Sequence, residues 1–173
     1  MELWDIYDKS RIKTGKTIER GKALPENGYH MVVHICIFNT QGEMLIQQRQ
    51  PFKEGWSNLW DITVGGSAIA GETSSMAAKR ELFEEIGYRY DFSKTRPSLT
   101  INFENGFDDY YLIEKDINID SLKLQYEEVQ RVKWASKDEI LNMINTEIFI
   151  PYYESMIQLL FDMHKHLGAH RGE

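Results

Sequence analysis

Hydrophobic and polar positions divide the chain into short apolar stretches separated by turn-forming residues, which predicts a protein rich in β-strands. The clearest stretch is YHMVVHICIFN at 29–39, which is apolar and β-branched over most of its length, as a strand buried on both faces would be. Residues 11–28 contain several glycines and a proline and are expected to be irregular. The predicted strands cover residues 2–8, 29–39, 43–50, 59–64, 97–103, 109–114 and 128–134.

Three segments have the composition and end signals of helices. Residues 74–86 are rich in good helix formers, with Thr73 or Ser74 suited to the N-cap and Gly87 to a left-handed C-cap. Strands interspersed with helices favour an α/β or α+β fold. The two further helices are expected over 137–145 and 151–166.

One face of the predicted helix 74–86 is acidic. Glu81, Glu84 and Glu85 are spaced i, i+3, i+4 and share one arc, where like charges repel. Mg²⁺ is commonly held by such carboxylates together with substrate phosphates. The alternative is a solvated acidic face with Lys79 and Arg80 as counterions. The arc expected to pack on the core consists of Met76, Ala78, Leu82, Phe83 and Ile86.

Composition and charge restrict the function further. A chain of 173 residues with 42% hydrophobic and 27% charged residues fits one globular domain. The net charge of −7 disfavours nonspecific binding to nucleic acid or anionic membranes. No apolar run reaches the length of a membrane span, and the first residues lack the layout of a signal peptide. Cys36 is the only cysteine, which excludes an intrachain disulfide, so we expect a reducing cytoplasm.

Residues 66–88, GSAIAGETSSMAAKRELFEEIGY, resemble the Nudix hydrolase signature. That signature is G, five residues, E, seven residues, then R-E-apolar-x-E-E-x-G-apolar, and only Tyr88 is a loose match because an aliphatic residue is commoner there. The resemblance implies a single Nudix domain over 1–173, folded as an α/β/α sandwich with a mixed sheet. The matching residues are Gly66, Glu72, Arg80, Glu81, Leu82, Glu84, Glu85, Gly87 and Tyr88.

The resemblance also implies a divalent metal, Mg²⁺ or Mn²⁺, and hydrolysis of a small-molecule diphosphate by metal-activated water. Family members often add a carboxylate from a later strand, for which Glu128 is our candidate and Glu127 the alternative; a solvated strand end would explain either equally well. Arg80 is expected to orient the carboxylates, Glu72 to pair with the helix, and Glu81 to accept a proton. The implied metal ligands are Gly65, through its carbonyl, Glu81, Glu84, Glu85 and Glu128.

Substrate contacts are less well defined by the sequence. Arg49 could hold a phosphate, although an outward-facing strand arginine would look the same, and Lys53 could help to shape the substrate mouth. Asp109, with its neighbour Asp108, is a further candidate, with a structural role favoured. Trp56 and Trp60 could line the mouth but are more often packing residues. His30 and His34 share one strand face, where histidines usually have structural partners rather than a metal.

A second resemblance covers most of the chain and is to the isopentenyl-diphosphate isomerase branch of the same superfamily, through YHMVVHICIFNTQGEMLIQQR, KEGWSNLWDITVGGSAIAGE and EEVQRVKW. Those isomerases use a cysteine just before the first glycine of the signature and a histidine just after it. This chain has Gly65 and Ser67 there, so we expect a hydrolase on an isomerase-like body. The alternatives are an isomerase with displaced catalytic groups and a noncatalytic diphosphate-binding domain. A homodimer is compatible with either resemblance.

Overall fold

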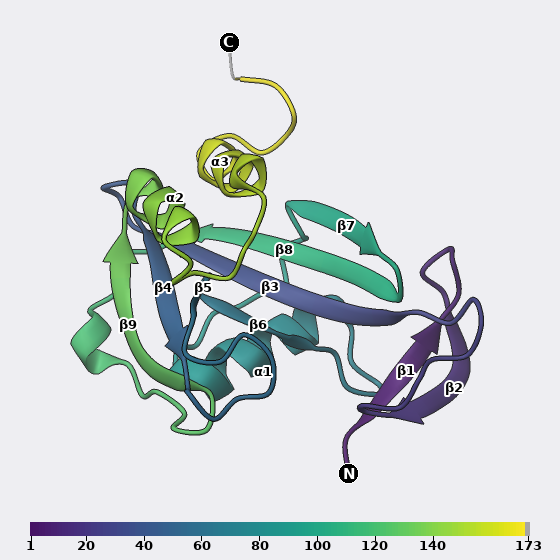
Figure 1. Ribbon diagram of the computed structural model, residues 1–173. Coiled ribbons are helices and arrows are strands. Elements are labelled where there is room, and N and C mark those ends of the chain that lie inside the picture. The colour runs from purple at the N-terminus through teal and green to yellow at the C-terminus, as the bar shows by residue number, and fades with distance from the viewer. Residues whose placement is uncertain (172–173) are drawn as a thin grey trace.

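Strand β3 (His30–Phe38) is the central strand of the fold (Figure 1). The computed structural model describes residues 1–171. The other strands are β1 (Leu3–Tyr7), β2 (Lys13–Glu19), β4 (Met44–Arg49), β5 (Trp60–Asp61), β6 (Val64–Ser67), β7 (Leu99–Phe103), β8 (Gly106–Glu114) and β9 (Val129–Ala135). The helices are α1 (Ser74–Ile86), α2 (Lys137–Asn145) and α3 (Glu154–Met163), with a short 3₁₀ turn at Ile119–Ser121.

The main sheet has seven strands and is mixed. Its path is β5-β4-β3-β8-β7, with β6 paired to β3 and β9 paired to β4. Strand β3 runs parallel to β8 and antiparallel to both β4 and β6. It pairs with β4 only at Phe38↔Met44, whereas it pairs with β6 from Val32↔Ser67 to Ile35↔Val64. The sheet therefore divides between β4 and β6, because the two strands share one edge of β3.

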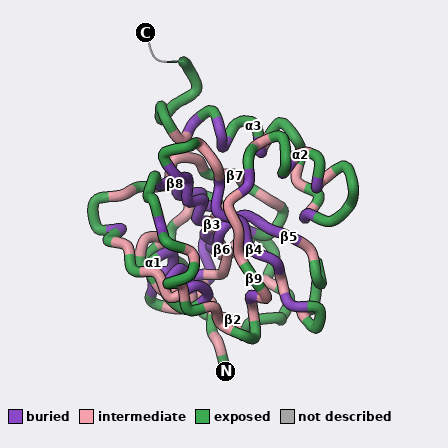
Figure 2. Tube along the Cα trace, turned by 90° about the vertical axis from the view of Figure 1, so that its left-hand side faces the viewer, coloured by how far each residue is buried: buried purple, intermediate pink, exposed green. Residues whose placement is uncertain are grey.

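Helices cover both faces of this sheet. Successive side chains of a strand point to opposite faces. Val33, Ile35 and Ile37 accordingly pack with the apolar side of α1, whereas Cys36 and Phe38 pack with α2 and α3. Buried residues concentrate on the central strands in Figure 2. The predicted α/β/α sandwich with a mixed sheet is confirmed.

Local end signals explain why two helices begin where the sequence predicts. Helix α1 spans Ser74–Ile86 as expected, with Thr73 accepting a hydrogen bond from the amide of Met76 and Gly87 left-handed at φ 70°. Helix α2 spans Lys137–Asn145. The last helix is shorter than predicted: α3 begins at Glu154 rather than Pro151 and ends at Met163. No helix among residues 1–171 is long and apolar enough to cross a membrane.

Two strand predictions were wrong. Residues 13–19 are not irregular but form β2, which pairs with β1 in a separate two-stranded sheet. Its side chains are mostly exposed and polar, so the sequence carries no apolar alternation, and Gly15 adopts a φ of 79° within the strand. The predicted strand 59–64 is two short strands, of which β5 pairs with β4 and β6 with β3.

Candidate active site

Glutamates of α1 lie across the division between β4 and β6. The Glu81 carboxyl group packs against Gly66 of β6, where an added Cβ would lie 2.1 Å from Glu81 Cδ. The Glu85 carboxylate accepts a hydrogen bond from Gln47 Nε2 of β4 at 2.7 Å. Glu84 is the exposed member, with 48% of its side chain accessible. The three carboxylates thus share one side of α1, but Glu85 points into the protein.

The core-facing arc of α1 is rotated relative to the prediction. Met76 and Phe83 are 52% and 42% exposed, whereas Ala77 and Glu85 are buried. The expectation that Met76 and Phe83 pack on the core was therefore wrong. Burial of a carboxylate in their place is costly unless the group is paired, which makes Glu85 the unusual residue of this helix.

Arg80 organises the carboxylates. Its Nε and Nη2 donate to both oxygens of Glu72 at 2.8 and 2.9 Å, and Nη2 also donates to the Ser67 carbonyl at 3.0 Å. Its Nη1 lies 2.9 Å from both Glu81 and Glu84. These hydrogen bonds, with that to Glu72 first among them, raise the pKa of Arg80, which keeps the guanidinium charged. Arg80 therefore contacts Glu72, Glu81 and Glu84, and its role in orienting the carboxylates for a reaction stays a prediction.

Burial disfavours the charged forms of two of the glutamates. Desolvation raises the pKa of Glu81 to about 7, even though Arg80 opposes the shift. Desolvation also raises the pKa of Glu85 well above its usual range, and the negative charges of Glu81, Glu128 and Asp61 add to this shift. A single amide from Gln47 offsets it only in part.

These residues fit a hard divalent cation in their chemistry. Within residues 1–171, no three acidic, histidine or cysteine side chains converge in a preformed metal cluster. Arg80 is paired with both Glu81 and Glu84. The fit lies in one buried carboxylate, Glu85, and one partly buried carboxylate, Glu81, whose charges repel each other and whose protein partners do not fully compensate them, a condition that an oxygen-binding cation relieves. Glu128 is near enough to raise the pKa of Glu85 but is paired with Lys53.

Gly65 and Gly66 lie between the glutamates and a cavity on the opposite face of the sheet. Gly65 pairs with His34 of β3, and a Cβ on Gly65 would lie 2.9 Å from His34 Nδ1. Gly66 faces Glu81 on the other side. Because neighbouring strand residues point to opposite faces, this glycine pair leaves the strand without a Cβ on either side.

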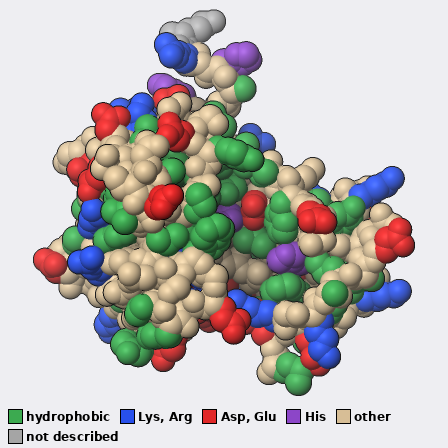
Figure 3. Space-filling view, in the orientation of Figure 1, with side chains coloured by type: hydrophobic (Ala, Val, Ile, Leu, Met, Phe, Trp, Pro, Cys, Tyr) green, Lys and Arg blue, Asp and Glu red, His purple; other side chains and the backbone are tan. Residues whose placement is uncertain are grey.

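The cavity has a volume of about 370 Å³. In Figure 3, histidine and acidic side chains lie among hydrophobic side chains across the middle of the face that is shown. His34 donates to or accepts from Asp108 at 3.1 Å and stacks on Tyr110. The lining residues are Val32, His34, Arg49, Trp56, Asp61, Phe103, Asp108, Tyr110, Ile150 and Tyr152.

The structure places the three substrate candidates in different surroundings and encloses one of them. Arg49 lines the cavity, and Lys53 pairs with Glu128. Asp109 is a correction: its side chain is 0% exposed and its oxygens are taken by Arg11 at 2.7 Å and by Thr100 and Ser74 at 2.6 Å. An enclosed carboxylate with these partners cannot contact a substrate and instead fixes β8 to neighbouring segments.

Three residues of the site were missed by sequence reasoning. Gln47 contacts Glu85, and Asp61 and Tyr152 form a hydrogen-bonded pair of 2.9 Å in the cavity wall. An acid in an otherwise apolar stretch, LWDITV, was the available signal for Asp61. Gln47 and Tyr152 have no local signal, because their roles depend on which distant segments they meet.

Comparison with known proteins identifies the class. A family model of the NUDIX domain matches residues 28–155. The chain therefore belongs to the Nudix family. An uncharacterized Nudix hydrolase of Listeria monocytogenes is 47% identical over 153 residues, which cover 88% of this chain and 90% of that protein, and the chain is accordingly a Nudix-type hydrolase.

Two further comparisons are more distant. A crystal structure of a protein from Deinococcus radiodurans superposes with a TM-score of 0.73 at 23% identity, covering 92% of this chain and 97% of that one, which supports the fold alone. An isopentenyl-diphosphate Delta-isomerase of Pectobacterium atrosepticum is 27% identical over 157 residues, covering 86% of each chain. The isomerase resemblance is thus real but weaker than the resemblance to Nudix hydrolases.

Proposed function

We propose that the protein hydrolyses a diphosphate linkage in a small molecule with the help of Mg²⁺ or Mn²⁺. The observation that carries this proposal is the pair of carboxylates where the sheet divides, of which Glu85 is buried and Glu81 partly buried. Folding keeps their charges close together although burial disfavours both. Functional sites are where such destabilised ionisable groups are concentrated.

The chain's own residues have distinct tasks in this proposal. Glu81, Glu84, Glu85 and the carbonyl of Gly65 would hold the cation, with Glu128 as a further ligand. When bound, the cation screens phosphate charge and lowers the pKa of water. Glu81 is our candidate to accept a proton from water, because its carboxyl group lies against the side-chain-free strand at Gly66. Arg80 keeps the Glu81 and Glu84 carboxylates oriented.

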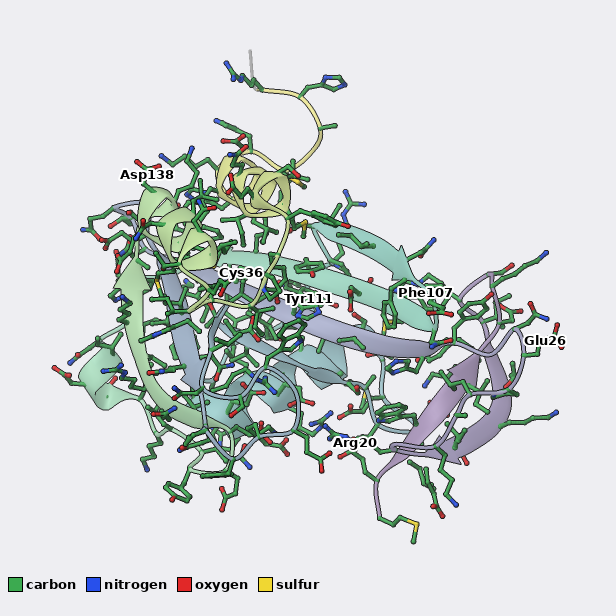
Figure 4. All side chains as sticks on the ribbon, in the orientation of Figure 1. Arg20, Glu26, Cys36, Phe107, Tyr111 and Asp138 are labelled. Atoms are coloured by element: carbon green, nitrogen blue, oxygen red, sulfur yellow. The ribbon has the colours of Figure 1, made fainter. Side chains whose placement is uncertain are left out.

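The competing isomerase reaction needs a proton donor at the alkene. Gly65 and Ser67 supply neither a thiol nor an imidazole. Cys36 is fully buried, burial raises the pKa of its thiol, and it lies near the centre of the molecule in Figure 4. We therefore expect no isomerisation of isopentenyl diphosphate.

The test is a screen of nucleoside diphosphate derivatives, nucleotide sugars and prenyl diphosphates with Mg²⁺, Mn²⁺ or excess chelator, followed by NMR identification of products. We expect release of phosphate or a monophosphate from at least one class, and none in chelator. Formation of dimethylallyl diphosphate from isopentenyl diphosphate would contradict the proposal, as would turnover that chelator does not affect.

A further inference from the structure

The outward side of α1 carries two large apolar side chains. Met76 and Phe83 are exposed, whereas the other apolar side chains of this helix are buried. Seven positions along an α-helix make about two turns, so these two residues share one side of α1, roughly 10 Å apart along its axis. A ligand here could bury apolar area that the fold leaves in water. Both residues line a hollow of about 310 Å³, whose full lining is Glu72, Met76, Lys79, Arg80, Phe83 and Arg89.

Two cations of this hollow have no carboxylate partner. Lys79 and Arg89 are exposed, and neither forms an ion pair or a side-chain hydrogen bond with any of residues 1–171. The Arg89 guanidinium instead lies over the ring of Phe83, with its central carbon 4.0 Å from the ring centroid. A guanidinium held over an aromatic face still has its N–H groups free along its edge. The hollow therefore offers unpaired positive charge directly beside apolar surface.

The one carboxylate of the hollow is already paired. Both oxygens of Glu72 accept hydrogen bonds from Arg80, at 2.8 and 2.9 Å. The charges that remain for an incoming group are those of Lys79 and Arg89, which are both positive although the chain as a whole has a net charge of −7. A negatively charged ligand is the complementary one.

The hollow continues beyond Lys79. Two smaller hollows, of about 190 and 260 Å³, are also lined by Lys79 and extend to Asp91; the first shares Met76 with the large hollow and the second shares Arg89. Together they form what we call the α1 groove, defined by Met76, Lys79, Phe83, Arg89 and Asp91. An extended peptide rises about 3.3 Å per residue, so three or four residues would span the roughly 10 Å from Met76 to Phe83.

We propose that the α1 groove binds a short acidic segment of a partner protein, with an apolar side chain of that segment placed against Met76 and Phe83. Carboxylates of the segment would pair with Lys79 and with Arg89, which Phe83 orients. Asp91 would repel a carboxylate at the far end, so the acidic positions are expected between the two cations. Methionine, aromatic residues and arginine are the residue types that protein interfaces favour, and methionine adapts to different apolar partners.

Two other occupants fit the groove less well. A second copy of the chain, docked by the same groove across a two-fold axis, would bring Lys79 and Arg89 against their own counterparts. An anionic membrane would also meet the exposed carboxylates of Glu84 and Asp91, on a chain of net negative charge. A peptide avoids both conflicts, because its charges can be placed one by one.

The experiment selects peptides from a random-sequence display library on the full chain at low ionic strength. A parallel selection uses Phe83→Ser, and the most enriched peptide is then titrated by fluorescence anisotropy. We expect peptides that combine Asp or Glu with an apolar residue, and an affinity that falls as salt is added, because salt screens exposed charge pairs. Enrichment of basic or uncharged peptides, or the same peptides on Phe83→Ser, would overturn the inference.

Two variants divide the groove into its apolar and its charged part. Phe83→Ser should weaken the best peptide about 10-fold or more, as loss of a central aromatic anchor does. Lys79→Glu combined with Arg89→Glu should weaken it by a similar factor and should bind a peptide whose acidic residues are replaced by lysine better than wild type does. Failure of this exchanged pair to bind, in a variant that thermal unfolding shows to be folded, would contradict the charge pairing.

Matched controls make the same changes elsewhere. Leu159→Ser removes an exposed apolar side chain from α3, and Lys9→Glu combined with Lys16→Glu reverses two exposed cations near the β1–β2 sheet. Neither control should change the affinity for the peptide by more than about 2-fold. A loss as large as that of the groove variants would show that only the overall charge or apolar surface matters, and would overturn the inference.

The remaining outcomes concern the other occupants. Sedimentation measures self-association, and a dimer that is lost in Phe83→Ser would assign the groove to a second copy and overturn the inference. Binding to phosphatidylglycerol vesicles, without binding to any acidic peptide, would assign it to a lipid surface with the same consequence. The inference is independent of the proposed function, because no side chain of the α1 groove belongs to the proposed metal site. The groove variants should therefore hydrolyse the diphosphate found in the screen at the wild-type rate.

Discussion

Gly66 should be the least replaceable glycine of the site. A Cβ at this position would lie 2.1 Å from Glu81 Cδ and 2.2 Å from its Oε1, whereas ordinary van der Waals contacts begin near 3.4 Å. The carboxylate must therefore move by roughly 1 Å in Gly66→Ala. A misplacement of this size at a catalytic group can lower turnover by about 100-fold.

Gly65→Ala is the comparison on the same strand, and it keeps the backbone carbonyl that we propose as a cation ligand. Its Cβ would meet His34 Nδ1 at 2.9 Å, on the other face of the sheet and away from Glu81. A small shift of the His34 ring relieves this contact, so we expect a decrease in kcat/KM of less than about 10-fold.

The assay is steady-state hydrolysis of the best diphosphate from the screen, with Mg²⁺ present. Thermal unfolding of each variant shows whether the protein remains folded, which we expect because the displaced carboxylate can turn toward solvent. Wild-type turnover by Gly66→Ala would refute the reasoning, since Glu81 would then not need its position against β6. An equal loss in Gly65→Ala would also refute it.

Three further predictions follow from the contacts. Arg80→Lys cannot reproduce the paired hydrogen bonds to Glu72, and should lower the unfolding free energy by about 1–3 kcal/mol and reduce kcat more than it changes KM, as measured by denaturation and kinetics. Cys36→Ala should leave hydrolysis intact, and loss of turnover in a folded variant would show that the buried thiol takes part. Burial raises the pKa of Asp61 above its ordinary 3.8, so its contribution to stability is full below that pH and is lost as pH rises through the folded-state pKa. The melting temperature of Asp61→Asn should therefore rise relative to that of the wild type as pH increases from 4 to 7.5. A difference in melting temperature that stays constant over this range would contradict the prediction. The charged or titratable groups facing Asp61 are Arg49, His34, Tyr152, Tyr110, Cys36 and Glu85.

Features with local causes could be predicted from the sequence. The ends of α1 follow from Thr73 and Gly87, which act on the backbone of adjacent residues. The central strand follows from its own apolar run. The spacing of the glutamates placed them on one side of α1, but not the depth at which each one lies.

Features that depend on distant partners could not be predicted. Spacing along a helix does not show which of two neighbouring arcs meets the sheet. The buried face of α1 is rotated slightly from the predicted one, so that it contains Ala77 and Glu85 rather than Met76 and Phe83. The sequence favoured a structural role for Asp109 but could not name its partner Arg11, which lies 98 positions earlier. The hydrogen bond between Asp61 and Tyr152 likewise joins residues 91 positions apart. No local pattern encodes these contacts.

The most direct test of the account is the turnover of Glu85→Gln in saturating Mg²⁺. This change keeps the shape of the side chain, and removing a buried charge that is near Glu81 should leave the protein at least as stable as wild type without metal. The account predicts a folded variant whose kcat/KM falls by about 100-fold or more. A folded Glu85→Gln variant that hydrolyses the same diphosphate at the wild-type rate would contradict it.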